Sequence, residues 1–134
     1  MLLDAPAAPR QRSAFFGLLI GGTLLAMLAV FALASPDPDW LADAELARLM
    51  RYMAVVKFAF VVIAAGLLYW RFARVIARPL LASYLGGTWM MAVACVLIFQ
   101  LTAIPLAAAV FHAGGFALLV AACLDQRDGA TLAD

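Results

Sequence analysis

Four stretches of about 20 predominantly apolar residues dominate this sequence of 134 residues. They cover residues 15–34, 49–70, 80–101 and 104–124. A helix of about 20 residues is long enough to cross the hydrocarbon core of a bilayer, which is about 30 Å thick. Helices also satisfy every backbone N–H and C=O without water. The sequence therefore predicts an all-α fold, with residues 1–134 forming a single domain of four transmembrane helices in a bundle with short loops.

The composition excludes a water-soluble domain. Hydrophobic residues make up 68% of the chain and charged residues 13%, whereas soluble domains carry about 25% charged residues. The lipid bilayer is therefore the first expected partner. A net charge of +1, with no clustered basic face, argues against nucleic acid as another.

The basic residues predict how the chain lies in the membrane. Arg10 and Arg12 precede the first apolar stretch, and three arginines lie between the second and third. The segment 35–47 carries four acidic residues and no basic one. The positive-inside rule then places both termini in the cytoplasm. A multi-pass protein of a bacterial-type inner membrane is the expectation.

The first apolar stretch has two interpretations. Its end, Ala32-Leu33-Ala34-Ser35, is typical of a signal-peptidase site. A signal peptide has an apolar region of about 7–15 residues, however, and this one is longer. A retained membrane anchor is therefore the prediction, and cleavage would leave three spans with the same orientation.

Three arginines follow the second apolar stretch at a spacing of three and four residues: Arg71, Arg74 and Arg78. This spacing predicts one face of a short helical extension, which ends where Pro79 disfavours a helical conformation for Arg78. The favoured interpretation is the topological signal of a cytoplasmic loop. The alternative is a surface that binds anionic lipid headgroups.

The last two apolar stretches are joined by a very short turn around Thr102, so they are expected to be antiparallel neighbours. Thr102 is a predicted N-cap of the last helix, and Asp37 is a predicted N-cap of a short helix that begins at Pro38. Small residues within the spans are predicted helix-packing positions, because they allow backbones to approach closely. These residues are Gly17, Gly21, Ser83, Gly86, Gly87, Gly114 and Gly115.

Ionisable residues inside a bilayer are costly and often functional. With Arg51 at the membrane entrance of its span, Lys57 and His112 are the two such residues inside the bilayer, at predicted depths of about 8 Å and about 12 Å from the outer interface. With Gln100 and Thr102 they form a candidate polar pocket that opens outward. The alternatives are that Lys57 extends to the interface, and that His112 and Gln100 bond to backbone carbonyls at helix contacts.

The sequence contains no motif for catalysis or for metal binding. There is no HExxH, no CxxC and no glycine-rich phosphate loop, and Cys95 and Cys123 are predicted free thiols. A b-type haem held by two histidines would need a second chain, or a methionine ligand, beside His112. No catalytic residue and no cofactor are predicted.

These observations predict a non-enzymatic membrane protein, namely an accessory, assembly or scaffold subunit of a membrane complex. Its expected partners are other membrane-protein subunits or further copies of itself. The alternative is a small transporter or proton-coupled carrier that uses Lys57 and His112 in an outward-facing pocket. A third interpretation is a subunit that binds b-type haem or quinone.

Overall fold

The structure is a computed structural model that describes the backbone of residues 9–130 and the side chains as far as residue 126. Its elements are α1 (Pro9–Leu33), α2 (Pro38–Leu41), α3 (Ala44–Arg71), α4 (Arg78–Phe99) and α5 (Ile104–Ala130). The terminal segments 1–8 and 131–134 lie outside the described residues. The two ends of the predicted domain of residues 1–134 fall there.

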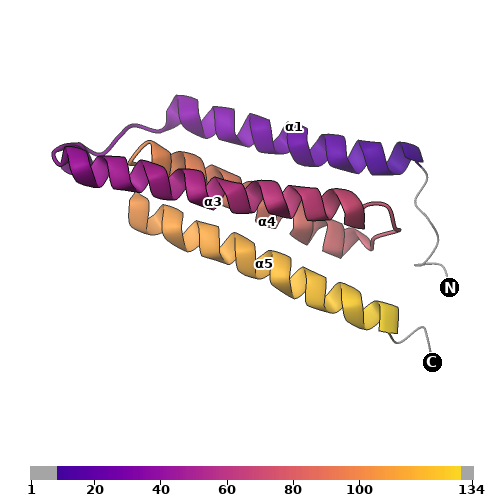
Figure 1. The fold of residues 1–134 in the computed structure, drawn as a ribbon. Coiled ribbons are helices and arrows are strands. Elements are labelled where there is room, and N and C mark those ends of the chain that lie inside the picture. Colours follow the sequence, from indigo (N-terminus) through magenta and orange to yellow (C-terminus); the bar gives the residue numbers. More distant parts are fainter. Residues whose placement is uncertain (1–8, 131–134) are drawn as a thin grey trace.

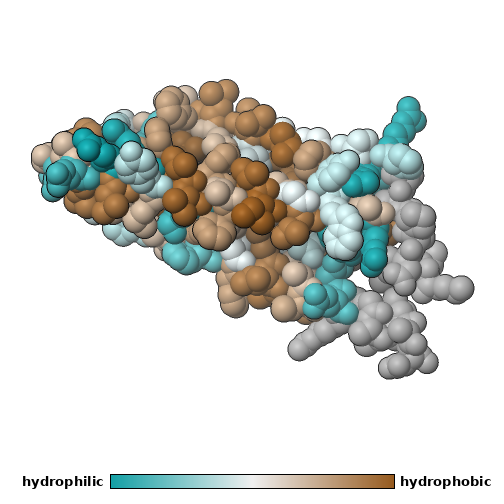
Figure 2. Space-filling view, viewed as in Figure 1, coloured by the Kyte–Doolittle hydropathy of each residue, from teal (hydrophilic) through white to brown (hydrophobic). Residues whose placement is uncertain are grey.

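The predicted bundle of four transmembrane helices is confirmed. Within the described chain, four helices are long and apolar enough to span a membrane: Pro9–Leu33, Ala44–Arg71, Arg78–Phe99 and Ile104–Gln126. They lie along one another (Figure 1), and hydrophobic side chains form a broad band across the middle of the face shown in Figure 2. The chain is a multi-span membrane protein whose apolar surface contacts lipid.

The helices alternate in direction, so the bundle has two distinct ends (Figure 1). At the basic end, α1 begins, α5 ends, and the α3–α4 connection carries Arg74 and Arg78. At the acidic end, α1 is joined to α3 through α2, with Asp37, Asp39 and Asp43. These two names are used below.

Helix α4 is the centre of the bundle. In its most apolar stretch 56% of the residues are buried, compared with at most 17% in the other spans. Helices α1, α3 and α5 pack around it, while their other faces expose large apolar side chains. Exposure of an apolar surface of this extent to water is unfavourable, so these faces are stable only in contact with lipid.

The contact between α4 and α5 is the closest in the bundle, and it confirms that these helices are antiparallel neighbours. A Cβ atom added to Gly87 would lie 2.8 Å from the carbonyl oxygen of Gly114. A Cβ atom added to Gly114 would lie 2.6 Å from the carbonyl oxygen of Gly87. The two backbones therefore touch, and only glycine fits at either position.

Trp89 of α4 makes a specific contact with α1. The Trp89 indole packs against Gly22, where an added Cβ would lie 2.7 Å from the Trp89 Cε2 atom. The indole Nε1 donates a hydrogen bond of 3.3 Å to the carbonyl oxygen of Leu19, whose side chain is fully buried. This glycine was missed by the sequence analysis, which selected Gly17 and Gly21 instead.

The turn between α4 and α5 holds two residues in the left-handed region. Leu101 has φ 60° and Ala103 has φ 44°, which costs a non-glycine residue roughly 1–2 kcal/mol. Burial of the Leu101 side chain against Ala47 and Ile104 offsets that cost. The exposed Ala103 has no such compensation.

Two local predictions are wrong and one is confirmed. Thr102 does not cap α5, because α5 begins at Ile104 and its N-cap position is Ala103. The Thr102 hydroxyl donates instead to the carbonyl oxygen of Ser35 at 2.8 Å. Arg71, Arg74 and Arg78 do not share a helical face, because α3 ends at Arg71 and residues 72–77 are not helical. Asp37 does cap α2, accepting a hydrogen bond of 3.1 Å from the backbone N–H of Asp39.

The arginine prediction failed because buried side chains, rather than helix periodicity, set the path of residues 72–77. Phe72 is fully buried and Ile76 is buried, so this connection packs against the helices at the basic end. Helix α4 then begins at Arg78 with Pro79 in its first turn, where the N–H that proline lacks would have no partner within the helix.

We predict that Ala103→Gly stabilises the protein by about 1 kcal/mol, because glycine adopts a positive φ without strain. Thermal unfolding in detergent micelles measures the change. Ala109→Gly in the exposed interior of α5 is the matched control and should destabilise by about 1 kcal/mol. Equal effects of the two substitutions would contradict the assignment of strain to Ala103.

Candidate functional site

Two of the predicted pocket residues join the α4–α5 turn to the end of α1. The side-chain Nε2 of Gln100 donates a hydrogen bond of 2.9 Å to the carbonyl oxygen of Phe31, and the Thr102 hydroxyl donates to Ser35. The last carbonyls of a helix have no partner within the helix. Gln100 supplies such a donor to Phe31, in the last turn of α1, whereas Thr102 donates to Ser35, in the segment that follows α1. Within the described chain, the buried Oε1 atom of Gln100 has no hydrogen-bond partner.

The other two predicted pocket residues flank one aromatic ring. The Nζ atom of Lys57, on α3, lies 4.2 Å from the centroid of the Phe111 ring, on α5. The His112 ring meets Phe111 edge-on, with the centroids 5.8 Å apart. An ammonium group over an aromatic face is stabilised by the ring quadrupole, more strongly where water is excluded. Lys57 therefore links α3 to α5 by a cation–π contact.

His112 points away from the bundle and is exposed on α5. Its Nδ1 atom lies 2.7 Å from the carbonyl oxygen of Ala108, one turn earlier in the same helix. A carbonyl only accepts, so Nδ1 carries the proton in this contact and Nε2 is left as an acceptor. The exposed side of His112 faces the surrounding bilayer.

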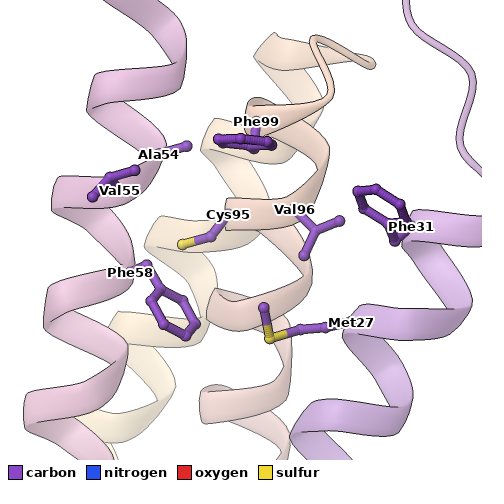
Figure 3. A pocket seen from close by; sticks show the side chains of 8 residues that line it. All are labelled: Met27, Phe31, Ala54, Val55, Phe58, Cys95, Val96 and Phe99. Atoms are coloured by element: carbon purple, nitrogen blue, oxygen red, sulfur yellow. The ribbon is translucent and has the colours of Figure 1, made fainter.

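The four residues thus form two pairs, one at the end of α1 and one around Phe111. A pocket shared by all four stays a prediction. A cavity lies elsewhere, on the surface of α4 between α1 and α3 (Figure 3). It has a volume of about 280 Å³ and an entirely apolar lining. Its lining residues are Met27, Phe31, Ala54, Val55, Phe58, Cys95, Val96 and Phe99.

This cavity can hold a hydrocarbon group, but its lining provides no polar or catalytic group. Phe31 and Met27 approach it from α1, and Phe58 from α3 (Figure 3). Its one reactive atom, the Cys95 sulfur, lies in a lining with no base or charged group. Reactive cysteines lie in partly exposed, electropositive surroundings, and this lining provides none.

At the basic end a partly buried polar cluster connects three helices. The guanidinium of Arg71, at the end of α3, forms a bidentate ion pair with the carboxylate of Asp125 on α5. The Tyr84 hydroxyl, on α4, donates to the same carboxylate at 3.2 Å. The side chains of Arg71 and Asp125 are only 25% and 14% exposed. Bidentate geometry is the strong form of this pairing.

The sequence analysis missed this cluster, because it ended the last span at residue 124, one residue before Asp125. Asp125 lies within the helix of the last span. A signal was present: Arg71 directly follows the second apolar stretch and Asp125 directly follows the fourth. Opposite charges at the same membrane boundary on two helices are natural partners.

Of three further arginines at the basic end, one contacts α3 and two are exposed. Arg12, on α1, stacks its guanidinium 4.0 Å from the centroid of the Tyr69 ring and donates through Nε to the Tyr69 carbonyl oxygen at 3.3 Å. Arg74 and Arg78 are exposed. Lipid headgroup binding by the 71–78 arginines stays a prediction, and Arg71 itself is engaged by Asp125.

Some of the predicted packing residues contact another helix and others do not. Gly87 and Gly114 form the contact between α4 and α5, and a Cβ atom added to Gly115 would lie 4.0 Å from the Met91 sulfur. An added Cβ at Gly17, Gly21 or Gly86 would meet no described atom within 4 Å. Ser83 donates through its hydroxyl to the carbonyl oxygen of Pro79 at 3.1 Å, within its own helix. Gly17 and Gly21 thus form an open face of α1.

Comparison with known proteins adds no relative: no protein-family model, no curated protein and no solved structure matches this chain. The functional argument therefore uses the residues of the chain itself.

We predict that the Arg71–Asp125 pair is strongly coupled. Arg71→Ala and Asp125→Ala should each destabilise by about 3 kcal/mol, since each leaves a largely buried charge without its partner. The double variant should lose far less than the sum. Tyr84→Phe should cost only about 1 kcal/mol, because it removes one hydrogen bond. Thermal unfolding in detergent completes the double-mutant cycle, and additive losses would contradict the pairing.

Proposed function

We propose that this chain is a non-enzymatic accessory, assembly or scaffold subunit of a membrane complex, in a bacterial-type inner membrane with its basic end in the cytoplasm. One observation carries the proposal. The polar side chains at membrane depth make contacts within the chain or face lipid, and the cavity between α1 and α3 is apolar throughout. Structural polar contacts of this kind stabilise a fold rather than move a solute.

The alternative of a small carrier needs a different arrangement. Carriers bind polar solutes or ions between helices, where unwound backbone or convergent polar groups replace water. Lys57 lies instead over the Phe111 ring, and Gln100 donates to the end of α1. These contacts favour the scaffold over the carrier.

Because the connections are short, the outer faces of the helices are the main surface for contacts with other proteins. Helix α1 has the least buried span, with 6% of its apolar stretch buried. It carries Gly17 and Gly21 one turn apart on a face where an added side chain meets no described atom. Paired small residues four positions apart allow another membrane helix to approach closely. We infer that this face of α1 contacts another subunit.

The test is recovery of a partner from native membranes in mild detergent. Gly17→Leu combined with Gly21→Leu should reduce recovery of the partner about tenfold, the effect of about 1.4 kcal/mol. The yield and the melting temperature of the chain itself should stay unchanged, because these positions are open. Gly66→Leu on α3, where an added Cβ also meets no described atom within 4 Å, is the matched control and should retain the partner.

Lys57→Met separates the scaffold from the carrier. A scaffold should keep its partner after this substitution, because the methionine retains the apolar stem at the α3–α5 contact. Loss of solute uptake in proteoliposomes on Lys57→Met, together with no partner in stoichiometric amount, would overturn the proposal in favour of the carrier.

A further inference from the structure

The apolar cavity between α1 and α3 has a buried floor and an exposed rim. Ala54 and Cys95 on its floor are buried. Phe31, Val55 and Phe99 on its rim are between 45% and 58% exposed. Helices α1 and α3 pack mainly on α4 rather than on each other. The cavity therefore opens between them toward the surrounding lipid (Figure 3).

Hydrocarbon is the occupant that this lining selects. The volume of about 280 Å³ is about twice that of an apolar cavity of roughly 150 Å³ that binds benzene in another protein. A water molecule needs at least two polar partners, which an entirely apolar lining does not supply. An empty space of this size would leave the lining atoms without dispersion contacts. Acyl chains surround the rim, so one of them can enter from the side.

The cavity lies in the half of the bundle nearer the acidic end. Helix α4 ends at Phe99, and α1 ends two residues after Phe31. Cys95 lies four residues before Phe99, about 6 Å further from that end. An acyl chain in the cavity therefore belongs to a lipid of the leaflet beside the acidic end, and the headgroup of that lipid lies near this end.

An exposed arginine lies on the cavity side of α3, one turn nearer the acidic end. Ala54, Val55 and Phe58 line the cavity and follow Arg51 by three, four and seven residues. This spacing keeps residues on one face of a helix. Helical side chains lean toward the N-terminus of their helix, which for α3 is at the acidic end. The stem of Arg51 can thus extend along the apolar surface and hold its guanidinium at the interface, above the cavity.

The charges along α3 leave the position of Arg51 cationic. Glu45 and Asp43 precede Arg51 by six and eight residues, which is about 9 Å and about 12 Å along the helix. Exposed charges beyond about 8 Å are largely screened at physiological salt. Arg48, three residues before Arg51, is a second exposed cation. The headgroup that suits this position is therefore anionic, and a guanidinium pairs with phosphate through two parallel N–H···O bonds.

We propose that the cavity and Arg51 form a binding site for one anionic phospholipid. One acyl chain fills the cavity, the phosphate pairs with the Arg51 guanidinium, and the second chain stays in the bilayer. The bound chain then fills the space between α1 and α3 on the surface of α4. This site goes beyond the proposed function. It does not involve Gly17 or Gly21, so it holds whether or not another subunit contacts that face of α1.

Photolabelling in phosphatidylcholine vesicles tests where the lipid binds. The probe is phosphatidylglycerol with a diazirine in one acyl chain, and mass spectrometry maps the labelled residues. Unlabelled phosphatidylglycerol should reduce labelling of Phe58 and Val96 about fivefold more effectively than added phosphatidylcholine, the effect of one arginine at a membrane surface. At Phe116 and Leu119, which are exposed on α5, the two lipids should compete equally. Equal competition at both places would overturn the proposal, because it would show only general contact with the bilayer.

Neighbouring valines on α3 test the cavity itself. Val55 and Val56 are 58% and 60% exposed, but of the two only Val55 lines the cavity. Val55→Trp should fill the cavity and reduce labelling of Val96 about tenfold, whereas Val56→Trp should not. Equal labelling in the two variants would overturn the cavity as the site. The competition experiment uses the unaltered chain, so it decides the location however well the variants fold.

The headgroup contact is tested by Arg51→Gln. This variant should lose the preference for phosphatidylglycerol, while labelling of the cavity persists because a chain can still enter. Arg74→Gln, at an exposed position of the basic end, is the matched control and should keep the preference. An unchanged preference in Arg51→Gln would contradict the contact with phosphate. Glycerol phosphate carries the charge without the chains and should not displace the probe. Displacement by it would overturn the lipid as the occupant in favour of a soluble anion.

Discussion

The backbone contact of α4 with α5 at Gly87 and Gly114 determines much of this structure. Without side chains between them, the two helices approach until each glycine meets the carbonyl oxygen of the other. Helix α4 thereby becomes the buried centre, and α1 and α3 complete its surroundings. Apolar burial contributes little to helix association in lipid, because acyl chains are as apolar as leucine. Close packing at small residues therefore has a large share in holding the bundle together.

Polar groups complete this packing at the two ends, where the helices leave the hydrocarbon. At the basic end, Arg71, Tyr84 and Asp125 connect α3, α4 and α5. At the acidic end, Gln100 and Thr102 connect the α4–α5 turn to α1. His112, exposed on α5, pairs its Nδ1 atom with the carbonyl oxygen of Ala108 in its own helix. The cavity between α1 and α3 is lined by apolar residues, and this favours a structural role over solute transport.

Sequence patterns predicted the number of spans, their bounds to within a few residues, and the α4–α5 hairpin, because these follow from hydropathy and loop length. They did not predict the rotation of each helix, since the spans are apolar on every side and carry no periodic signal. Gly22 was missed for that reason, although the glycines of the α4–α5 contact were selected. The Arg71–Asp125 pair was missed because charges at helix ends were interpreted one loop at a time. Residue types alone do not determine whether Lys57, Gln100, Thr102 and His112 form one functional pocket, and this pocket stays a prediction.

The most direct test of this account is the unfolding stability of Gly114→Ala compared with Gly86→Ala in the same detergent. An added methyl group at Gly114 meets the backbone of α4, whereas at Gly86 it meets no described atom within 4 Å. We predict that Gly114→Ala destabilises by about 2 kcal/mol or more, because a backbone must move. Gly86→Ala should be neutral or stabilising by up to about 1 kcal/mol, from helix propensity alone. Equal tolerance of the two substitutions would contradict the close backbone contact on which the bundle is argued to depend.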